Sequence, residues 1–209
     1  KVFPFIDCLH NGERKIMKNT FIKAVYAGFM IGLGGVIYLS LENKIAGALL
    51  FSFGLLTIVN QGFALYTGKI GFVRTREDMA AIPVIIAGNF AGTLLTAVLC
   101  HMAGMKISAE AVCMNKLNNN PLSILVLSIF CGILMYLAID NFKKSGNHLF
   151  VIAPVMIFIL SGFEHSVANM FYFSLAGIWN GKSFSYLLLM ILGNGIGAKV
   201  FDFFKASGD

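Results

Sequence analysis

The chain has 209 residues, of which 57% are hydrophobic and only 12% are charged. An average soluble domain carries about 25% charged residues, so this composition excludes an ordinary soluble domain and is typical of a membrane protein. The formal net charge of +6 does not predict a nucleic-acid partner, because the positions of the charges along the chain matter more than their sum.

The predicted elements are membrane-spanning helices. Crossing about 30 Å of hydrocarbon takes roughly 20 apolar residues. The first 20 residues form a basic lead-in without the pattern of a removable signal peptide. In the last span we expect Lys199 to snorkel toward the interface. The chain is therefore predicted to be a single transmembrane domain, 1–209, with six spans at 24–41, 45–68, 79–105, 121–139, 149–181 and 183–204.

The distribution of basic residues predicts the topology. If the N-terminal segment 1–20 is cytoplasmic, 12 of the 16 Lys and Arg residues lie on the cytoplasmic side, and only Lys44, Lys106, Lys116 and Lys182 lie outside. The positive-inside rule then places both termini in the cytoplasm. We expect a multi-pass protein of the plasma membrane, whose surroundings are the lipid bilayer.

Two short motifs indicate an internal repeat. The third predicted span contains GNFAG (Gly88–Gly92) and the sixth contains GNGIG (Gly193–Gly197), about half the chain apart. Such glycine patterns also recur by chance in membrane helices, but here each closes a set of three spans. An odd number of spans per half makes the second half insert upside down, which predicts an inverted repeat of 21–105 and 117–204. Asn89 and Asn194 are expected to give structural support.

The middle span of each half carries polar residues and glycine at mid-length. The stretches are IVNQGFALYTGKIGF, residues 58–72, and SGFEHSVANMF, residues 161–171. Such patterns are typical of discontinuous helices, whose freed backbone groups must line an enclosed path because lipid cannot satisfy them. We therefore predict broken second and fifth helices, with helix N-termini that offer N–H donors to an anion.

An ionisable pair lies in the fifth span. His165 could be a structural histidine, but an ionisable residue inside a span is a functional candidate by default. Glu164 is its neighbour and would point about 100° away on a helix. We therefore expect Glu164 to be an orienting acceptor that supports the structure and does not line the same path.

These motifs resemble the formate/nitrite transporter family, which includes formate, nitrite and hydrosulfide channels. The resemblance covers about 21–204 and depends on GFEHSVANMF, ALYTGK and the two Gly-Asn pairs. It implies an aquaporin-like fold, a homopentamer with one pore in each protomer, and passage of small monovalent anions with proton coupling under some conditions. The short connections and LYTGK favour the hydrosulfide-type branch. The usual phenylalanine before Thr67 is Tyr66 here, a departure from the family pattern.

The resemblance also implies site residues. His165 matches the central pore histidine. Lys116, matched across a gap, either attracts anions to the outer mouth or is an ordinary loop lysine. Thr67 and Asn169, at the two breaks, either bond freed backbone groups or bond the substrate. Apolar residues match constriction positions, although ordinary core packing is the alternative: Phe51, Leu55, Leu65 and Phe158.

An anion is strongly disfavoured in a low-dielectric region. Histidine has a reference pKa of about 6.5, so His165 could take a proton near the anion or give one to it.

The predicted function is a channel or transporter for formate, nitrite or hydrosulfide, without catalytic residues, metal or cofactor. An enzyme is not expected, because His10, His101 and His148 do not converge on the pair. A neutral-solute aquaporin-like channel and a membrane structural protein are the alternatives. The sequence does not decide which anion is preferred, or whether the protein is a channel or a proton-coupled carrier.

Overall fold

The computed structural model describes residues 3–206, with side chains for 15–205. All regular elements in this part of the chain are helical, as predicted. Five helices are long and apolar enough to cross a membrane, and α7 is a shorter apolar helix. The elements in order are α1 (Phe3–Ser40), α2 (Lys44–Gln61), α3 (Tyr66–Lys69), η1 (Ile70–Phe72), α4 (Arg76–Met102), α5 (Glu110–Leu117), α6 (Pro121–Ser145), α7 (Leu149–Leu160), α8 (Ser166–Ala176) and α9 (Gly181–Ala206).

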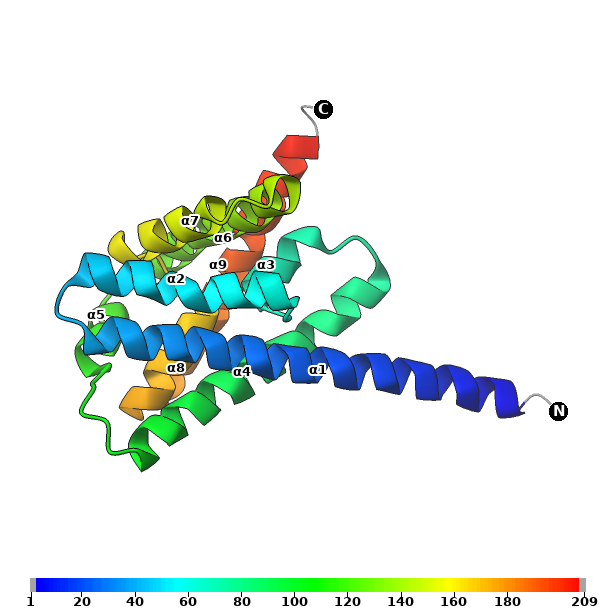
Figure 1. The fold of residues 1–209 in the computed structure, drawn as a ribbon, viewed down its shortest axis with the longest axis horizontal. Coiled ribbons are helices and arrows are strands. Elements are labelled where there is room, and N and C mark those ends of the chain that lie inside the picture. Colours follow the sequence, from blue (N-terminus) through cyan, green and yellow to red (C-terminus); the bar gives the residue numbers. More distant parts are fainter. Residues whose placement is uncertain (1–2, 207–209) are drawn as a thin grey trace.

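Two elements differ from the sequence prediction. Helix α1 begins at Phe3, well before the first predicted span, and its N-terminal half projects beyond the other helices (Figure 1). Of the predicted N-terminal segment 1–20, residues 1–2 lie outside the described part of the chain. Helix α5 lies in a connection for which no helix was predicted. It is amphipathic enough to bury Cys113 and Leu117, and this burial holds it against the bundle.

Local sequence signals explain where the long helices begin and end. Asn43 and Asn120 cap α2 and α6, because each side-chain oxygen accepts hydrogen bonds from backbone N–H groups of the first turn. Thr75 and Asp78 form a reciprocal capping box at the start of α4. Helix α2 ends at Gly62, whose φ of 66° is a left-handed conformation that glycine adopts without strain.

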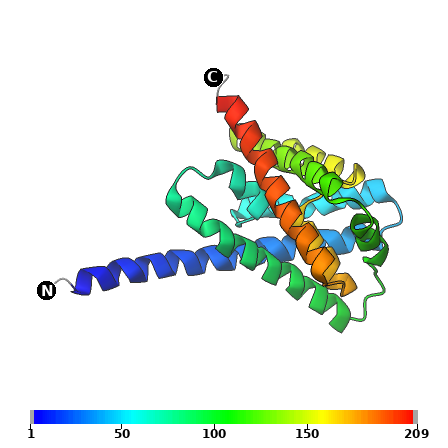
Figure 2. The same ribbon diagram turned by 180° about the vertical axis from the view of Figure 1, so that it is seen from behind.

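The two halves of the chain pack in the same way. Helix α1 lies against α4, and α6 lies against α9 (Figure 2). In both pairs a glycine lets the helices approach closely. A Cβ atom on Gly28 would lie 2.1 Å from the carbonyl oxygen of Asn89, and one on Gly132 would lie 2.2 Å from that of Asn194. These small residues therefore let helices of the same half pack closely.

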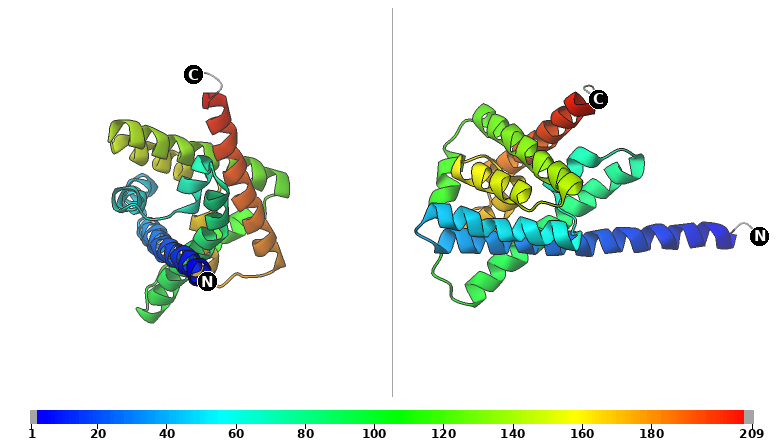
Figure 3. Two further views of the ribbon diagram at one scale, coloured as in Figure 1. Left: turned by 90° about the vertical axis from the view of Figure 1, so that its right-hand side faces the viewer. Right: turned by 45° about the horizontal axis from the view of Figure 1, so that its top comes forward.

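The halves meet through shorter elements. Helix α2 packs against both α1 and α7, and α8 packs against α4 (Figure 3). The first interruption separates α2 from α3, and the second separates α7 from α8. Both interruptions follow a left-handed glycine, Gly62 and Gly162. The polar segments that the sequence singled out thus lie between short helices inside the bundle.

Asn89 holds the first interruption in place. Its side-chain Nδ2 donates to the backbone oxygens of Ala24 (2.8 Å) and Ala64 (2.9 Å), and its Oδ1 accepts from the N–H of Tyr66 (2.9 Å). One buried amide therefore joins α1, the residues before α3 and the first turn of α3. The backbone groups freed by the interruption are satisfied by this side chain.

Asn194 does the same for the second interruption. Its Nδ2 donates to the backbone oxygens of Ser128 and Glu164, each at 2.8 Å, and its Oδ1 accepts from the N–H of Ser166 at 2.9 Å. The same three bonds recur in both halves, so the Gly-Asn motif has one physical role in each. Asn89 and Asn194 fix where the shorter helices α3 and α8 begin.

Candidate functional site

His165 lies at the N-terminus of α8 and is 2% exposed. Its Nδ1 accepts a hydrogen bond from the backbone N–H of Ala168 (3.2 Å), and its Nε2 lies 2.9 Å from Thr67 Oγ1. Because Nδ1 is an acceptor, the proton of the neutral ring is on Nε2 and is donated to Thr67. The Thr67 hydroxyl proton is then directed elsewhere. The contact joins α8 to α3, so it links the two interruptions.

Aromatic rings surround this contact. Phe158 stacks on the His165 ring with centroids 5.3 Å apart, and Phe51 meets Phe158 edge-on at 6.0 Å. Leu55 and Leu65 are also buried, at 2% and 1% exposure. Phe158 and Phe51 therefore lie on one side of the histidine, and Leu55 and Leu65 belong to the same hydrophobic core; we call these four residues the buried layer.

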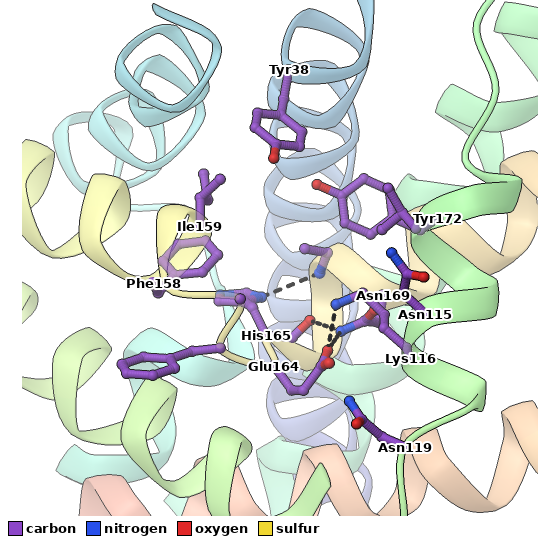
Figure 4. Close-up of a pocket in the computed structure, with 14 residues that line it drawn as sticks. Tyr38, Asn115, Lys116, Asn119, Phe158, Ile159, Glu164, His165, Asn169 and Tyr172 are labelled. Atoms are coloured by element: carbon purple, nitrogen blue, oxygen red, sulfur yellow. Dashed lines mark hydrogen bonds and ion pairs between the residues drawn. The ribbon is translucent and has the colours of Figure 1, made fainter. Parts of the chain in front are cut away.

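A charged cluster lies beside His165 (Figure 4). The Lys116 ammonium on α5 is 2.6 Å from Glu164 Oε2, and Asn169 Nδ2 donates to the same oxygen at 2.8 Å. Glu164 is 2% exposed, so its charge is compensated by the lysine and the amide together. Lys116 is thus an ion-pair partner of Glu164. Glu164 therefore accepts from both Lys116 and Asn169.

Glu164 and His165 line the same cavity. Their side chains were expected to point about 100° apart and not to line the same path. That expectation applies to consecutive residues on a helix. Both residues lie before α8, in the interruption, where the backbone of His165 is extended with φ −93° and ψ 113°. The helical rule therefore does not set their relative directions.

Two cavities adjoin the buried layer and share no lining residue. The first, of about 270 Å³, is lined by Lys116, Phe158, Glu164, His165 and Asn169, among others. The second, of about 170 Å³, is lined by Leu55, Leu65, Gly68, Lys69 and Lys143, among others. We call them the outer cavity and the inner cavity, after the predicted topology.

Several lining residues of the outer cavity were not predicted, among them Tyr38, Asn119 and Tyr172, which have polar side chains. Tyr172 and Tyr38 line it on the side away from Glu164, and Asn119 lies at its other edge (Figure 4). Tyr172 lies seven residues after His165 and three after Asn169, so the helical period could have found it. Tyr38 and Asn119 belong to α1 and to the residues before α6, and only the fold brings them here.

The cavity also contains an acceptor without a donor. Among buried side-chain polar atoms in the described part of the chain, Asn169 Oδ1 and Ser166 Oγ have no hydrogen-bond partner. Asn169 lines the outer cavity, and its Nδ2 is already used by Glu164 and by the His165 backbone. Its oxygen can therefore accept a hydrogen bond from a protonated solute or from water.

The cysteine near the outer cavity does not supply a reactive group. Cys100, Cys113 and Cys131 are buried free thiols. Near the outer cavity, on α5, burial raises the pKa of the Cys113 thiol to about 12. The thiol therefore stays protonated at neutral pH, and thiolate chemistry is not expected from it.

Comparison with known proteins shows which solved structures share this fold. A family model described as formate/nitrite transporter matches residues 7–204. A solved pentameric formate channel with formate bound matches this chain with a TM-score of 0.81 and 22% sequence identity. The match covers 93% of this chain and 97% of that channel. At that identity the likeness shows a shared fold.

Curated relatives are channels and transporters rather than enzymes. The formate channel FocA of Haemophilus influenzae is 26% identical over 182 residues, which cover 73% of this chain and 64% of that protein. The chain therefore spans less than two thirds of that relative. The nitrite transporter NirC of Escherichia coli is 26% identical over 216 residues, covering 87% of this chain and 80% of that protein. With the family model matching nearly its whole length, the chain is a membrane protein that belongs to the formate/nitrite transporter family.

Proposed function

We propose that the chain forms a membrane channel or transporter for small monovalent weak-acid anions, of the class of formate, nitrite or hydrosulfide. The observation that carries the proposal is the Thr67–His165 hydrogen bond, which joins the two interruptions within the buried layer next to both cavities. A structural histidine would need no cavity on either side of its layer. The names of the relatives, a formate channel and a nitrite transporter, support the same class of solute.

The proposed membrane arrangement has six crossings in one domain, 1–209, with inverted repeats 21–105 and 117–204. The five helices in the described part of the chain that are long enough to cross a membrane do not include α7 and α8. We therefore assign α7 and α8 together to the fifth crossing, and α2 with α3 to the second. Lys69 and Lys143 line the inner cavity, which fits a cytoplasmic mouth and cytoplasmic termini.

The proposed assembly is a homopentamer with one pore in each protomer, in the plasma membrane. The pentameric structure that shares this fold supports it. Helix α4 has a row of exposed apolar residues that must contact lipid or another copy: Leu94, Leu95, Val98 and Leu99.

The proposed passage begins in the outer cavity. The ion pair of Lys116 and Glu164 is neutral as a whole, so the cavity does not repel an anion. At the buried layer the anion meets the Thr67 hydroxyl, whose proton is not used by His165. The hydroxyl can therefore donate to the anion.

Proton transfer then lowers the electrostatic barrier. An anion beside His165 favours the doubly protonated ring, and the added proton comes from the external solution through the outer cavity and goes to Nδ1, because Nε2 is already protonated. This proton displaces the N–H of Ala168, so the charged ring is favoured only while an anion is near. The ring then gives one proton to the anion and returns to neutral, and the resulting acid crosses the apolar layer uncharged. Asn169 Oδ1 is placed to accept from such an acid.

Flux into proteoliposomes that contain only the purified chain tests this function. We expect formate, nitrite and hydrosulfide to enter faster than into protein-free liposomes, with rates that rise as the external solution becomes more acidic. Glycerol and urea should not enter faster. If none of the anions moves, the transport function is refuted, and selective glycerol entry would favour the neutral-solute alternative.

A further inference from the structure

The segment made of α3 and η1, residues 66–72, is too short to hold its own position. Each helix terminus leaves several backbone groups unpaired, and a helix of one turn forms almost none of its own bonds. Yet this segment carries Thr67 and directly follows Leu65. Asn89 fixes only its first residue, Tyr66. Something else must hold the rest of it.

Helix α9 contacts the start of the segment. The Tyr66 hydroxyl donates to the backbone oxygen of Ile191 at 2.7 Å. Gly195, one turn further along α9, leaves the space for this hydroxyl, since a Cβ atom there would lie 2.9 Å from it. Tyr66 is the position at which this chain departs from the phenylalanine expected from the family resemblance, and its hydroxyl makes a contact that phenylalanine cannot make.

Lys199 contacts the other end of the segment. Its ammonium donates to the backbone oxygens of Val73 (2.6 Å) and Gly71 (3.3 Å), at the carboxyl end of η1. A cation at a helix C-terminus pairs with carbonyl groups that have no partner within the helix. The sequence prediction for Lys199 was that it snorkels toward the interface, and it did not identify these carbonyls as the groups that the ammonium contacts.

An ion pair extends the contact by a further turn. Arg74 Nη1 donates to the oxygens of Gly71 (3.1 Å) and Val73 (3.3 Å), and its Nη2 lies 2.6 Å from Asp202 Oδ1. The Tyr136 hydroxyl donates to the same carboxylate oxygen at 2.9 Å. Asp202 thus holds the arginine that caps η1, while Tyr136 holds Asp202.

The α9 residues of these contacts form a single stripe. Ile191, Gly195, Lys199 and Asp202 follow one another at spacings of four, four and three, which places them on one face of the helix. The offset that relates Asn89 to Asn194 relates this stripe to four apolar residues of α4: Ile86, Phe90, Leu94 and Ala97. The two halves of the repeat therefore differ at these four positions, which are apolar in α4 and supply the contacts to α3–η1 in α9.

We infer that the α9 stripe sets the position of α3–η1, and with it the places of Leu65 and Thr67 in the path, so that Lys199 and Tyr66 are positioning residues for transport. The part that concerns transport rests on the proposed function; the anchoring of the segment does not. Neither residue needs to touch the anion. They act by holding a segment that would otherwise move away from His165.

Hydrogen exchange followed by mass spectrometry tests the anchoring directly. In Lys199→Met we expect the amides of residues 66–73 to exchange about tenfold faster, because the charged donor to two carbonyls is lost. Exchange in α8 should not change. Lys199→Arg, which keeps a cation, should restore slow exchange. Lys205→Met is the matched control, because Lys205 is also a cation on α9 but pairs with Asp140.

The same variants are then compared in proteoliposomes with formate. Lys199→Met should conduct several-fold more slowly than Lys205→Met, and Lys199→Arg should recover the wild-type rate. Tyr66→Phe, which removes only a hydroxyl, is expected to speed exchange at 66–73 and to slow formate flux, as Lys199→Met does. It replaces Lys199→Met in the test if that variant does not fold. Unchanged exchange at 66–73 in both variants would overturn the inference, and so would faster exchange with an unchanged rate. A wild-type protein that conducts no anion would refute the proposed function, while the exchange data would still decide the anchoring.

Discussion

Replacing Asn194 by leucine is expected to lower the free energy of unfolding by about 3–6 kcal/mol, because three buried bonds are lost at once. The backbone N–H of Ser166 and the oxygens of Ser128 and Glu164 would lose this partner in a region where no water replaces it. The measurement is reversible unfolding in mixed detergent micelles.

The repeat supplies a second variant and the surface supplies a control. Asn89→Leu should lower stability by a similar amount, since Asn89 makes the corresponding three bonds in the first half. Asn19→Leu, at an exposed position of α1, should change it little. If Asn194→Leu were as stable as Asn19→Leu, the buried amides would not be what holds the interruptions.

Two substitutions at His165 separate its structural role from its role in transport. Asparagine is among the best helix N-cap residues, so His165→Asn keeps α8 capped, whereas His165→Phe loses the cap at a cost of about 1 kcal/mol. Neither can carry a proton. In both variants we expect proton-linked flux of weak acids to fall by roughly a hundredfold, the size of effect that a positioned proton donor supplies.

The pH profile of the remaining flux distinguishes the mechanisms. Wild-type flux should rise toward acidic pH more steeply than the concentration of the neutral acid alone predicts, and flux in His165→Asn should follow that concentration. An unchanged profile in a well-folded His165→Asn protein would remove His165 from the mechanism.

The sequence indicates much of the fold because its signals are local. Apolar length finds the long helices, and the recurrence of Gly-Asn singles out the two asparagines that make matching bonds, Asn89 and Asn194. What the motif does not reveal is which backbone groups Asn89 and Asn194 bind, since those groups belong to segments distant in sequence. The bonds of Asn194 reach from α9 to α6 and to the residue before His165.

The site is less predictable because it consists of contacts between distant segments. Lys116 and Glu164 were both candidates, but their ion pair joins residues 48 positions apart on α5 and before α8. The direction of Glu164 was wrong because a helical rule was applied to a non-helical stretch. The carbonyls that Lys199 contacts were not predicted, because nothing local shows that η1 ends beside it.

In the proposed mechanism the anion passes Leu65 on its way between the two cavities. The most direct measurement is formate flux through Leu65→Cys before and after treatment with methyl methanethiosulfonate, a small neutral thiol reagent. Wild type controls for the native cysteines, and Leu192→Cys, at a site that is 54% exposed on α9, controls for modification outside the path. We predict that modification stops most of the flux in Leu65→Cys and leaves the two controls unchanged. Flux that persists through fully modified Leu65→Cys would contradict the proposed path.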